Sequence, residues 1–374
     1  MPPACKLFSG YKPCFPGRVC TGESCADFDP IGTTILIVNL DAMGDVLMTT
    51  TQLPSLKQTY PQSTISWLTL ANAAPLLAGN PFIDRVFAYG PESLSILGGM
   101  AFDIVVNVDK TQRSCAAAMK VPAGRRLGFG MNERGQIIPL NEGARYNYRL
   151  GLDDTLKFRE NTRTRQDYVA ETLEVPYRRD EYVFALTDEE RAFTARYRES
   201  AGIPDNAPVI GFNTGCSTAF PNKKMTVAQH AELIERFLGD GRFPVVLVGG
   251  PEDTARNAEI AALFPGRVVN TPTTEGVRRG SCYESIPDII ITGDSFGMHL
   301  AIALKKYVIA WFGLSCHQEV DLYGRGDKLY PEGLACSPCW KRECPYNLEC
   351  IRQIDLDLIE RETIGYFERQ GRIS

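Results

Sequence analysis

The chain has 374 residues, 44% hydrophobic and 23% charged, and this ordinary globular composition predicts about two or three domains with sizeable cores. A formal net charge of −5 and a sequence pI near 5.5 argue against general nucleic-acid binding, which needs a basic surface. No apolar run is long enough to span a membrane and the first 30 residues lack a signal-peptide core, so we expect a cytoplasmic protein.

Clustered cysteines stand out among the 12 in the chain. In a reducing compartment, such clusters indicate metal binding or catalysis rather than disulfides. The first cluster lies in a segment, residues 1–30, that is poor in hydrophobic residues and would order most readily around a metal. Its members are Cys5, Cys14, Cys20 and Cys25. Their irregular spacing leaves open a disordered tail with incidental thiols. The scattered Cys115, Cys216, Cys282 and Cys316 are interpreted as small, partly buried apolar residues.

Residues 31–182 read as a first α/β domain, because apolar runs typical of buried parallel strands alternate with helical segments. The expected strands are Thr33–Leu40, Ile65–Leu70, Asp84–Tyr89, Asp103–Val108 and Arg126–Phe129. The expected helices are Val46–Tyr60 with a kink at Pro54, a short helix from Pro75, and Ser114–Val121. This alternation predicts a doubly wound domain whose ligand lies beyond the C-terminal ends of the strands.

Residues 130–182 are dense in charge and weak in periodicity. The cations there are Arg145, Arg149, Lys157, Arg159, Arg163 and Arg165. They form either a solvated surface or a basic lip that attracts an anionic acceptor.

Residues 183–335 read as a second α/β domain. The expected strands are Val209–Asn213, Val245–Val248, Val268–Asn270, Ile289–Thr292 and Val308–Phe312. The expected helices are Asp188–Ser200, Thr226–Leu238, Asp253–Leu263 and Ser295–Leu304. Residues 313–335 are expected to be a long loop, and the C-terminal segment 351–374 to hold a closing amphipathic helix, Asp355–Arg369.

A carboxylate follows the first strand in the motif Asp41-Ala-Met-Gly-Asp45. Asp45 at the end of a parallel strand is suited to act as a general base. Its position at a helix start leaves open a role as a helix cap. Asp41 is the second candidate for the base.

Two further strand-to-helix turns have the chemistry of phosphate and ribose binding. In Gly211–Met225, the hydroxyls of Ser217 and Thr218 can donate to phosphate oxygens and Lys223 supplies charge. After Val248, two glycines admit a ligand, and Glu252 or Asp253 could hold ribose hydroxyls. An ordinary loop and an ordinary helix start remain the alternatives.

The stretch Ile291–Leu304 combines a buried strand, a small-residue turn and a helix start, which is a ready anion site. Asp294 can cap the helix or accept from a ribose hydroxyl, and His299 can reach back from the first turn. A capped helix with a buried histidine is the alternative.

The second cysteine cluster, residues 336–350, contains Cys336, Cys339, Cys344 and Cys350. Its Cys-x-x-Cys start resembles a four-cysteine metal knuckle with no open coordination position, so we expect a structural metal. Zinc is the default, and iron suits the same sulfur set.

In this order, the motifs resemble glycosyltransferase family 9, the heptosyltransferase-like family of bacterial lipopolysaccharide and related glycan pathways. The residues that carry the resemblance are Ile35–Thr50, Asn213–Met225, Val246–Pro251, Thr292–Ala301 and Ala310–Gly313. The resemblance implies a GT-B fold, in which two Rossmann-like domains face a cleft, with the acceptor on the first and the nucleotide-sugar on the second. The closing helix would pack back across the domains.

The resemblance also implies the chemistry, an inverting transfer from a nucleotide-activated sugar, ADP-heptose in the best-known members, without a catalytic metal. Asp45 matches the family's base and Lys223 its phosphate-binding lysine, with Ser217 and Thr218 before it. The nucleotide and diphosphate turn matches Asp294, Ser295, Gly297 and His299.

Three departures from the family pattern refine these expectations. Phe296-Gly297 stands where many relatives have Gly-Pro, and Met225 where many have Trp. The C-terminal cysteine segment resembles the metal finger of some protein O-heptosyltransferases, so the acceptor is either lipopolysaccharide core, another surface glycan or a protein Ser/Thr. A lipopolysaccharide acceptor would bring the enzyme to the periphery of the inner membrane, and a homo-oligomer is a further expectation. The alternative function is a catalytically silent, nucleotide-sugar-binding scaffold.

Overall fold

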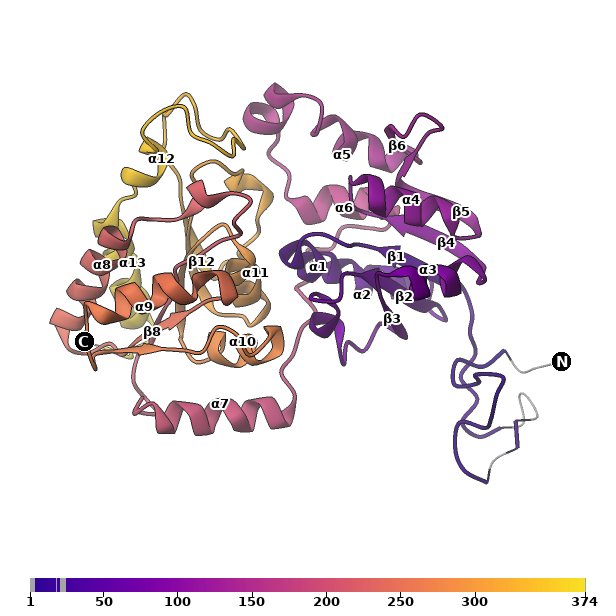
Figure 1. Cartoon of the computed structure of the whole chain (residues 1–374), viewed down its shortest axis with the longest axis horizontal. Coiled ribbons are helices and arrows are strands. Elements are labelled where there is room, and N and C mark those ends of the chain that lie inside the picture. The colour runs from indigo at the N-terminus through magenta and orange to yellow at the C-terminus, as the bar shows by residue number, and fades with distance from the viewer. Residues whose placement is uncertain (1–3, 18, 21–24, 374) are drawn as a thin grey trace. The chain divides into compact units, whose positions relative to one another are not determined.

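The chain folds into two compact units. The computed structural model describes residues 4–17, 19–20 and 25–373. The first unit runs to Asp153 and resumes over Arg165–Asp180, whereas the second takes Asp154–Thr164 and everything from Glu181. In each unit, a twisted sheet is flanked by helices (Figure 1).

The sheet of the first unit has six strands in the order β3-β2-β1-β4-β5-β6. All neighbouring strands pair in parallel except β5 and β6, which are antiparallel. The strands are β1 Thr34–Val38, β2 Thr64–Thr69, β3 Arg85–Ala88, β4 Phe102–Asn107, β5 Ala123–Met131 and β6 Ile137–Pro139. Residues Ile35 to Val38 are fully buried, as expected for a central strand covered on both faces.

Short helices and 3-10 turns connect these strands. The helices are α1 Met43–Thr49, α2 Leu53–Thr59, α3 Pro91–Gly98, α4 Gln112–Lys120, α5 Arg145–Arg149 and α6 Arg165–Leu173, and the 3-10 turns are Thr50–Gln52, Ala74–Leu77 and Glu142–Ala144. The helix expected over 46–60 is therefore two helices joined by a 3-10 turn. Pro54 lies in the first turn of α2, where its missing N–H leaves no intrahelical bond unmade.

The sheet of the second unit is entirely parallel, in the order β12-β11-β10-β7-β8-β9. Its strands are β7 Ile210–Asn213, β8 Val245–Val248, β9 Val268–Asn270, β10 Ile289–Gly293, β11 Tyr307–Trp311 and β12 Gly326–Leu329. Its helices are α7 Asp188–Ser200, α8 Val227–Asp240, α9 Thr254–Ala262, α10 Val277–Glu284, α11 Phe296–Ala303, α12 Glu349–Arg352 and α13 Leu356–Arg369. A π-helix, Leu156–Glu160, and 3-10 turns at Pro221–Lys223, Pro251–Asp253 and His317–Glu319 complete the unit.

The closing helix α13 belongs to the core of the second unit. It packs against α8 and contributes the buried Phe367 to a cluster that also holds Phe237 of α8, Phe212 of β7 and Trp311 of β11. This cluster joins α8 and α13 to the strands of the sheet and forms one core for the second unit.

Several elements of this fold, among them strand β6 and helices α5, α6 and α12, differ from the sequence-based expectations. The stretch 313–335 is not only a loop, since it contains the 3-10 turn at His317–Glu319 and strand β12. β12 reads Gly-Asp-Lys-Leu and pairs only with β11, so as an edge strand it lacks the apolar run that marks the others. Helices α3 and α10 are likewise additions to the expected elements. No helix in the described part of the chain combines the length and apolarity needed to cross a bilayer.

Candidate active site

The C-terminal end of β1 leads into the turn that carries Asp45. Ala42, in extended backbone, is the N-cap residue of α1, and Asp45 is the third residue of that helix. Asp45 Oδ2 accepts a hydrogen bond from Ala42 N at 3.4 Å, so this carboxylate helps to satisfy the helix start without being its N-cap residue. The same oxygen lies 3.0 Å from Arg165 Nη2, and the side chain of Asp45 is 24% exposed. Asp45 is therefore a solvent-accessible carboxylate held between a backbone amide and a guanidinium.

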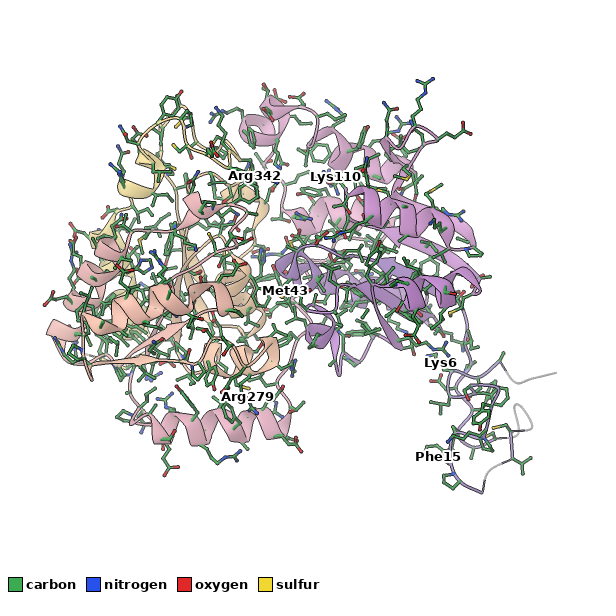
Figure 2. The ribbon with its side chains drawn as sticks, in the orientation of Figure 1. Lys6, Phe15, Met43, Lys110, Arg279 and Arg342 are labelled. Carbon is green, nitrogen blue, oxygen red and sulfur yellow. The ribbon has the colours of Figure 1, made fainter. Side chains whose placement is uncertain are left out.

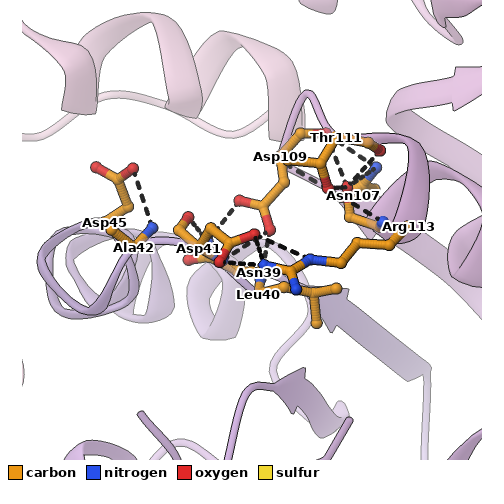
Figure 3. Close-up of polar contacts among 10 residues, drawn as sticks. Asn39, Leu40, Asp41, Ala42, Asp45, Asn107, Asp109, Thr111 and Arg113 are labelled. Atoms are coloured by element: carbon orange, nitrogen blue, oxygen red, sulfur yellow. Dashed lines mark hydrogen bonds and ion pairs between the residues drawn. The ribbon is translucent and has the colours of Figure 1, made fainter. Parts of the chain in front are cut away.

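A buried carboxylate, Asp109, holds the turn in place through hydrogen bonds (Figure 3). It follows β4, and it accepts from Asn39 Nδ2 at 2.7 Å, from Asp41 N at 3.2 Å and from the amide of Leu40. Burial raises the pKa of Asp109 to about 7, and the charge of Asp45 adds to the rise, whereas the hydrogen bonds oppose it. The turn is thus anchored to the neighbouring strand by its backbone amides.

Asp41 has a different partner from Asp45. It forms an ion pair with Arg113 of α4, whose Nε donates to Asp41 Oδ2 at 3.2 Å (Figure 3). Arg113 donates to both carboxylate oxygens of Asp41. By contrast, Arg165 and Ala42 N hold only Oδ2 of Asp45, so Asp45 is the better placed of the two to take a proton.

The strand ends of the second unit bring Lys223 and Asp294 together. Lys223 Nζ lies 2.6 Å from Asp294 Oδ2, and the two side chains are only 12% and 14% exposed. Burial opposes ionisation of Asp294, but attraction to Lys223 and His299 and the hydrogen bond from Lys223 lower its pKa below the usual value. Asp294 does not cap α11 as expected, because Ser295 is the N-cap residue and Asp294 is committed to the lysine.

Close backbone packing shapes the turn before α11. Asn213, at the end of β7, donates to Thr292 Oγ1 at 3.2 Å and to Ser295 Oγ at 3.0 Å. A Cβ on Gly297 would lie 1.6 Å from Asn213 Nδ2, so only glycine fits there. The turn therefore keeps the start of α11 against the end of β7, where backbone N–H groups point outward.

The other two predicted turns meet each other. Glu252 Oε2 accepts from the backbone N–H of Thr218 at 3.0 Å, and Ser217 and Thr218 are exposed. Asp253 is buried, accepts from Gly250 N at 3.0 Å, and fills the space beside Gly215, where a Cβ would lie 1.5 Å from its carboxylate. Glu252 is therefore accessible to a ligand, whereas Asp253 is a packing and turn residue.

His299 is held by an aromatic partner that the sequence did not indicate. Its Nδ1 lies 2.9 Å from the hydroxyl of Tyr182, and the two rings have centroids 6.2 Å apart. Tyr182 is buried and belongs to the stretch that leads into the second unit. The hydroxyl fixes the orientation of the imidazole on the first turn of α11.

The cysteines of residues 336–350 gather in one loop. Burial raises the pKa of Cys350 to about 11, and interaction with the thiols of Cys339, Cys336 and Cys344 adds to the rise, so all of them lie within electrostatic range. Over residues 4–17, 19–20 and 25–373, however, no group of three or more His, Cys, Asp or Glu side chains is arranged to hold a metal ion. The loop has the donor set of a sulfur site, but its thiols would have to draw closer to coordinate.

The N-terminal cysteines differ in their exposure to solvent. Cys5 is buried beside a β-bridge to Pro30, Cys14 is exposed, and Cys20 and Cys25 are intermediate. A metal at these residues stays a prediction.

The predicted site residues therefore form two constellations, one in each unit. Around Asp45, the structure adds Asp109 and Arg165, and around Lys223 and Asp294 it adds Asn213, Tyr182 and Trp340. Asp109 was detectable as a carboxylate directly after a strand. The contacts of Tyr182 and Trp340 join residues more than 100 positions apart, for which the sequence has no local signal.

Comparison with known proteins assigns this architecture. The model of glycosyltransferase family 9 (heptosyltransferase) matches residues 95–349, which is more than half of the chain. A Haemophilus influenzae protein provisionally named a glycosyltransferase is 23% identical over 339 residues, covering 87% of this chain and 95% of its own.

Two solved structures share the fold. Escherichia coli ADP-heptose lipopolysaccharide heptosyltransferase II superposes with a TM-score of 0.67 at 19% identity, over 91% of this chain and 100% of that one. The iron-containing dodecameric glycosyltransferase TibC of enterotoxigenic E. coli superposes with a TM-score of 0.53 at 12% identity, over 91% of this chain and 77% of that one. These likenesses identify the two parallel α/β sheets as the GT-B fold, and with the family match they lead to one conclusion: the chain is a glycosyltransferase and belongs to glycosyltransferase family 9.

Proposed function

We propose that this enzyme transfers heptose from ADP-heptose to a hydroxyl group of its acceptor, with inversion at the anomeric carbon. The observation that carries the proposal is the buried Lys223–Asp294 pair at the start of α11. A buried ammonium beside a helix N-terminus is suited to the negative charge that a nucleoside diphosphate develops as it leaves.

In the proposed reaction, the acceptor oxygen attacks the anomeric carbon as the bond from that carbon to the diphosphate oxygen breaks. Asp45 takes the proton of the acceptor hydroxyl, and the electron pair of the broken bond stays on ADP. Oδ2 of Asp45 is held by Ala42 N and Arg165, and Oδ1 has no hydrogen-bond partner within the described residues, which suits it to receive the proton. A general base of this kind contributes roughly 10²–10⁴ in rate.

The donor would lie along the strand ends of the second unit. Lys223 would neutralise the diphosphate, and Ser217, Thr218 and the first turn of α11 would donate to it. Glu252 would accept from a ribose hydroxyl. Ser295 and Gly297, which contact Asn213, would shape the turn, and His299, oriented by Tyr182, would lie on the first turn of α11 beside the diphosphate.

The experiment is a transfer assay with the full chain and a panel of ADP-heptose, UDP-glucose and GDP-mannose. Transfer from ADP-heptose alone is expected. Transfer from UDP-glucose or GDP-mannose would show that the donor is a different nucleotide-sugar. Transfer from none of the three donors, or hydrolysis of a donor without transfer, would contradict the proposal.

For the acceptor, the same assay is run with lipopolysaccharide core, with another surface glycan and with a protein carrying exposed Ser and Thr, and products are identified by mass spectrometry. We propose a protein acceptor first, because the C-terminal cysteine segment resembles the metal finger of some protein O-heptosyltransferases. Modification of a glycan but not of the protein would overturn the choice of a protein acceptor and would leave the proposed donor unchanged.

We also propose that Cys336, Cys339, Cys344 and Cys350 hold one structural metal ion, either zinc or iron. The support is the sequence itself, in which four cysteines lie within 15 residues and begin with a Cys-x-x-Cys pair. When bound, the metal would cross-link a loop that has little hydrophobic core of its own. An oligomer, as in dodecameric TibC, belongs to the same proposal, and light scattering of the purified chain tests it.

A further inference from the structure

Trp340, inside the C-terminal cysteine loop, contacts two lysine ammonium groups through its ring. Lys223 Nζ is 4.6 Å from the centroid of the indole ring, and Lys157 Nζ is 4.9 Å from it. Tryptophan is the aromatic side chain that best binds a cation through its face. Lys157 comes from the π-helix that joins the second unit, so one ring links three segments far apart in the sequence.

The ring is held firmly in this place. The backbone N–H groups of Cys339 and Trp340 both donate to the carbonyl of Leu314, at 3.0 Å and 2.9 Å, and Phe220 meets the indole edge-on at 5.2 Å. Trp340 has φ of 51°, a left-handed conformation that a bulky residue adopts only when its surroundings impose it. Such residues are frequent at ligand sites.

The same loop is tied to the lysine-bearing turn by a second contact. Asn222 Nδ2 donates to the carbonyl of Arg342 at 2.8 Å, and the guanidinium of Arg342, labelled in Figure 2, lies 5.9 Å from the ring of Phe220. The cysteine loop therefore touches two residues just before Lys223 as well as the lysine itself.

The charges around the ring are not balanced. Asp294 neutralises Lys223, but within the described residues no carboxylate lies within ion-pair distance of Lys157 Nζ. The cluster therefore carries one uncompensated positive charge, at Lys157, and an anion beside it would be attracted there.

We propose that Lys157 and Trp340 complete the diphosphate subsite that Lys223 begins, so that the cysteine loop is a wall of the donor site and not a remote structural module. This inference rests on the proposed function, since it names further residues for the same donor. Lys157 would contact the phosphate nearest the sugar, and Trp340 would keep the two ammonium groups apart and oriented.

The test compares ADP with AMP, because AMP lacks the phosphate that Lys157 would contact. Lys157→Met keeps the aliphatic stem and removes the charge, and it should weaken ADP binding roughly tenfold while AMP binding changes by less than about threefold, as measured by calorimetry. Lys341→Met is the matched control, since Lys341 is exposed in the same loop, and both affinities should stay unchanged. Equal losses for ADP and AMP, or no loss, would overturn the inference.

Trp340 is tested by its fluorescence. Trp67 is buried in the first core, whereas Trp311 is buried but donates to the carbonyl of Lys223 at 2.8 Å, so the part of the emission change on adding ADP that comes from Trp340 is the part that disappears in Trp340→Phe. Trp340→Leu should lower ADP affinity further than Trp340→Phe, with circular dichroism reporting that both variants remain folded. An unchanged response in Trp340→Phe would contradict the role of this ring.

The outcomes also separate this inference from the proposal on which it rests. If Lys223→Met loses ADP binding and Lys157→Met does not, the donor site stands and only its extension fails. If Lys223→Met binds ADP as the wild type does, the proposed donor site itself is wrong.

Discussion

At the residue scale, three carboxylates show how environment divides their roles. Asp45 is accessible and paired with Arg165, Asp294 is nearly buried and paired with Lys223, and Asp109 is buried among amide donors. The first suits proton transfer, the second holds a lysine in place, and the third holds a turn in place.

The first prediction concerns Asp45. Asp45→Asn keeps the side-chain shape but removes the base, so we expect transfer to fall by roughly 10²–10⁴ while ADP binding stays within about twofold of the wild type. A radiolabel transfer assay and calorimetry measure the two quantities. The control is Asp41→Asn, which should lose far less activity, and full turnover by Asp45→Asn would exclude it as the base.

The second prediction concerns the pH dependence of stability through Asp109. Its pKa is raised to about 7 in the folded protein from a usual value of 3.8, so its stabilising contribution is present at low pH and is lost as pH rises from 4 through 7. Asp109→Asn cannot ionise, so its free energy of unfolding relative to the wild type should increase over that range.

Asp103 is the matched control for this measurement. Hydrogen bonds from Thr34 lower its pKa, so its contribution is complete above pH 4. The difference between Asp103→Asn and the wild type should therefore be constant from pH 5 to pH 7 in urea unfolding. If the difference in unfolding free energy between Asp109→Asn and the wild type were also independent of pH, Asp109 would not titrate as described.

At the scale of elements, the sequence indicates the strands with apolar runs and the turns with small residues, because burial on both faces leaves an unmistakable pattern. The expected bounds of β1, β8 and β9 agree with the structure to within two residues. The edge strand β12 and helix α3 escape this reasoning, since neither is fully buried. In the site, the residues on the turns were predictable, but their partners were not, because Arg165 and Trp340 reach them from distant segments.

The third prediction uses two glycines in helices of the second unit. Gly297→Ala on α11 should destabilise the protein by about 1–3 kcal/mol, because its Cβ would displace the buried Asn213 amide from Thr292 and Ser295. Gly280→Ala on α10 meets nothing within 4 Å and should stabilise by about 0.5–1 kcal/mol. Opposite signs in urea unfolding are expected, and a stabilising Gly297→Ala would contradict the packing of this turn.

At the scale of the whole molecule, the two units have separate cores and should respond separately to a ligand. The fourth prediction is that ADP at about 100 times its Kd raises the unfolding transition of the second unit by an amount equivalent to about 2.7 kcal/mol. Differential scanning calorimetry should show the first unit's transition unmoved and the shift abolished in Lys223→Ala. A shift of the first unit's transition alone would show that ADP binds the first unit, which would contradict the prediction.

The fifth prediction is that elemental analysis of the purified chain finds about one zinc or iron per chain at the C-terminal cysteine loop, or two if the N-terminal cysteines bind as well. Cys336→Ser with Cys339→Ser should remove one equivalent and lower the thermal stability of the second unit, whereas Cys115→Ser should remove none. A folded wild-type protein without metal would refute it.

The path of the chain between its units has a practical consequence. Residues 154–164 belong to the second unit although the first unit resumes at Arg165, so the backbone passes from one unit to the other at Asp153–Asp154, Thr164–Arg165 and Glu181. A single cut after Asp180 would leave Lys157 and Arg159 on the N-terminal fragment, although both residues belong to the second unit. Within that unit, Arg159 donates to the carbonyls of Ala335 and Ser337. Co-expressed halves should therefore reassociate through an exchanged segment, in the manner of a split protein, and the isolated C-terminal half would be a poor substitute for the enzyme in donor-binding work.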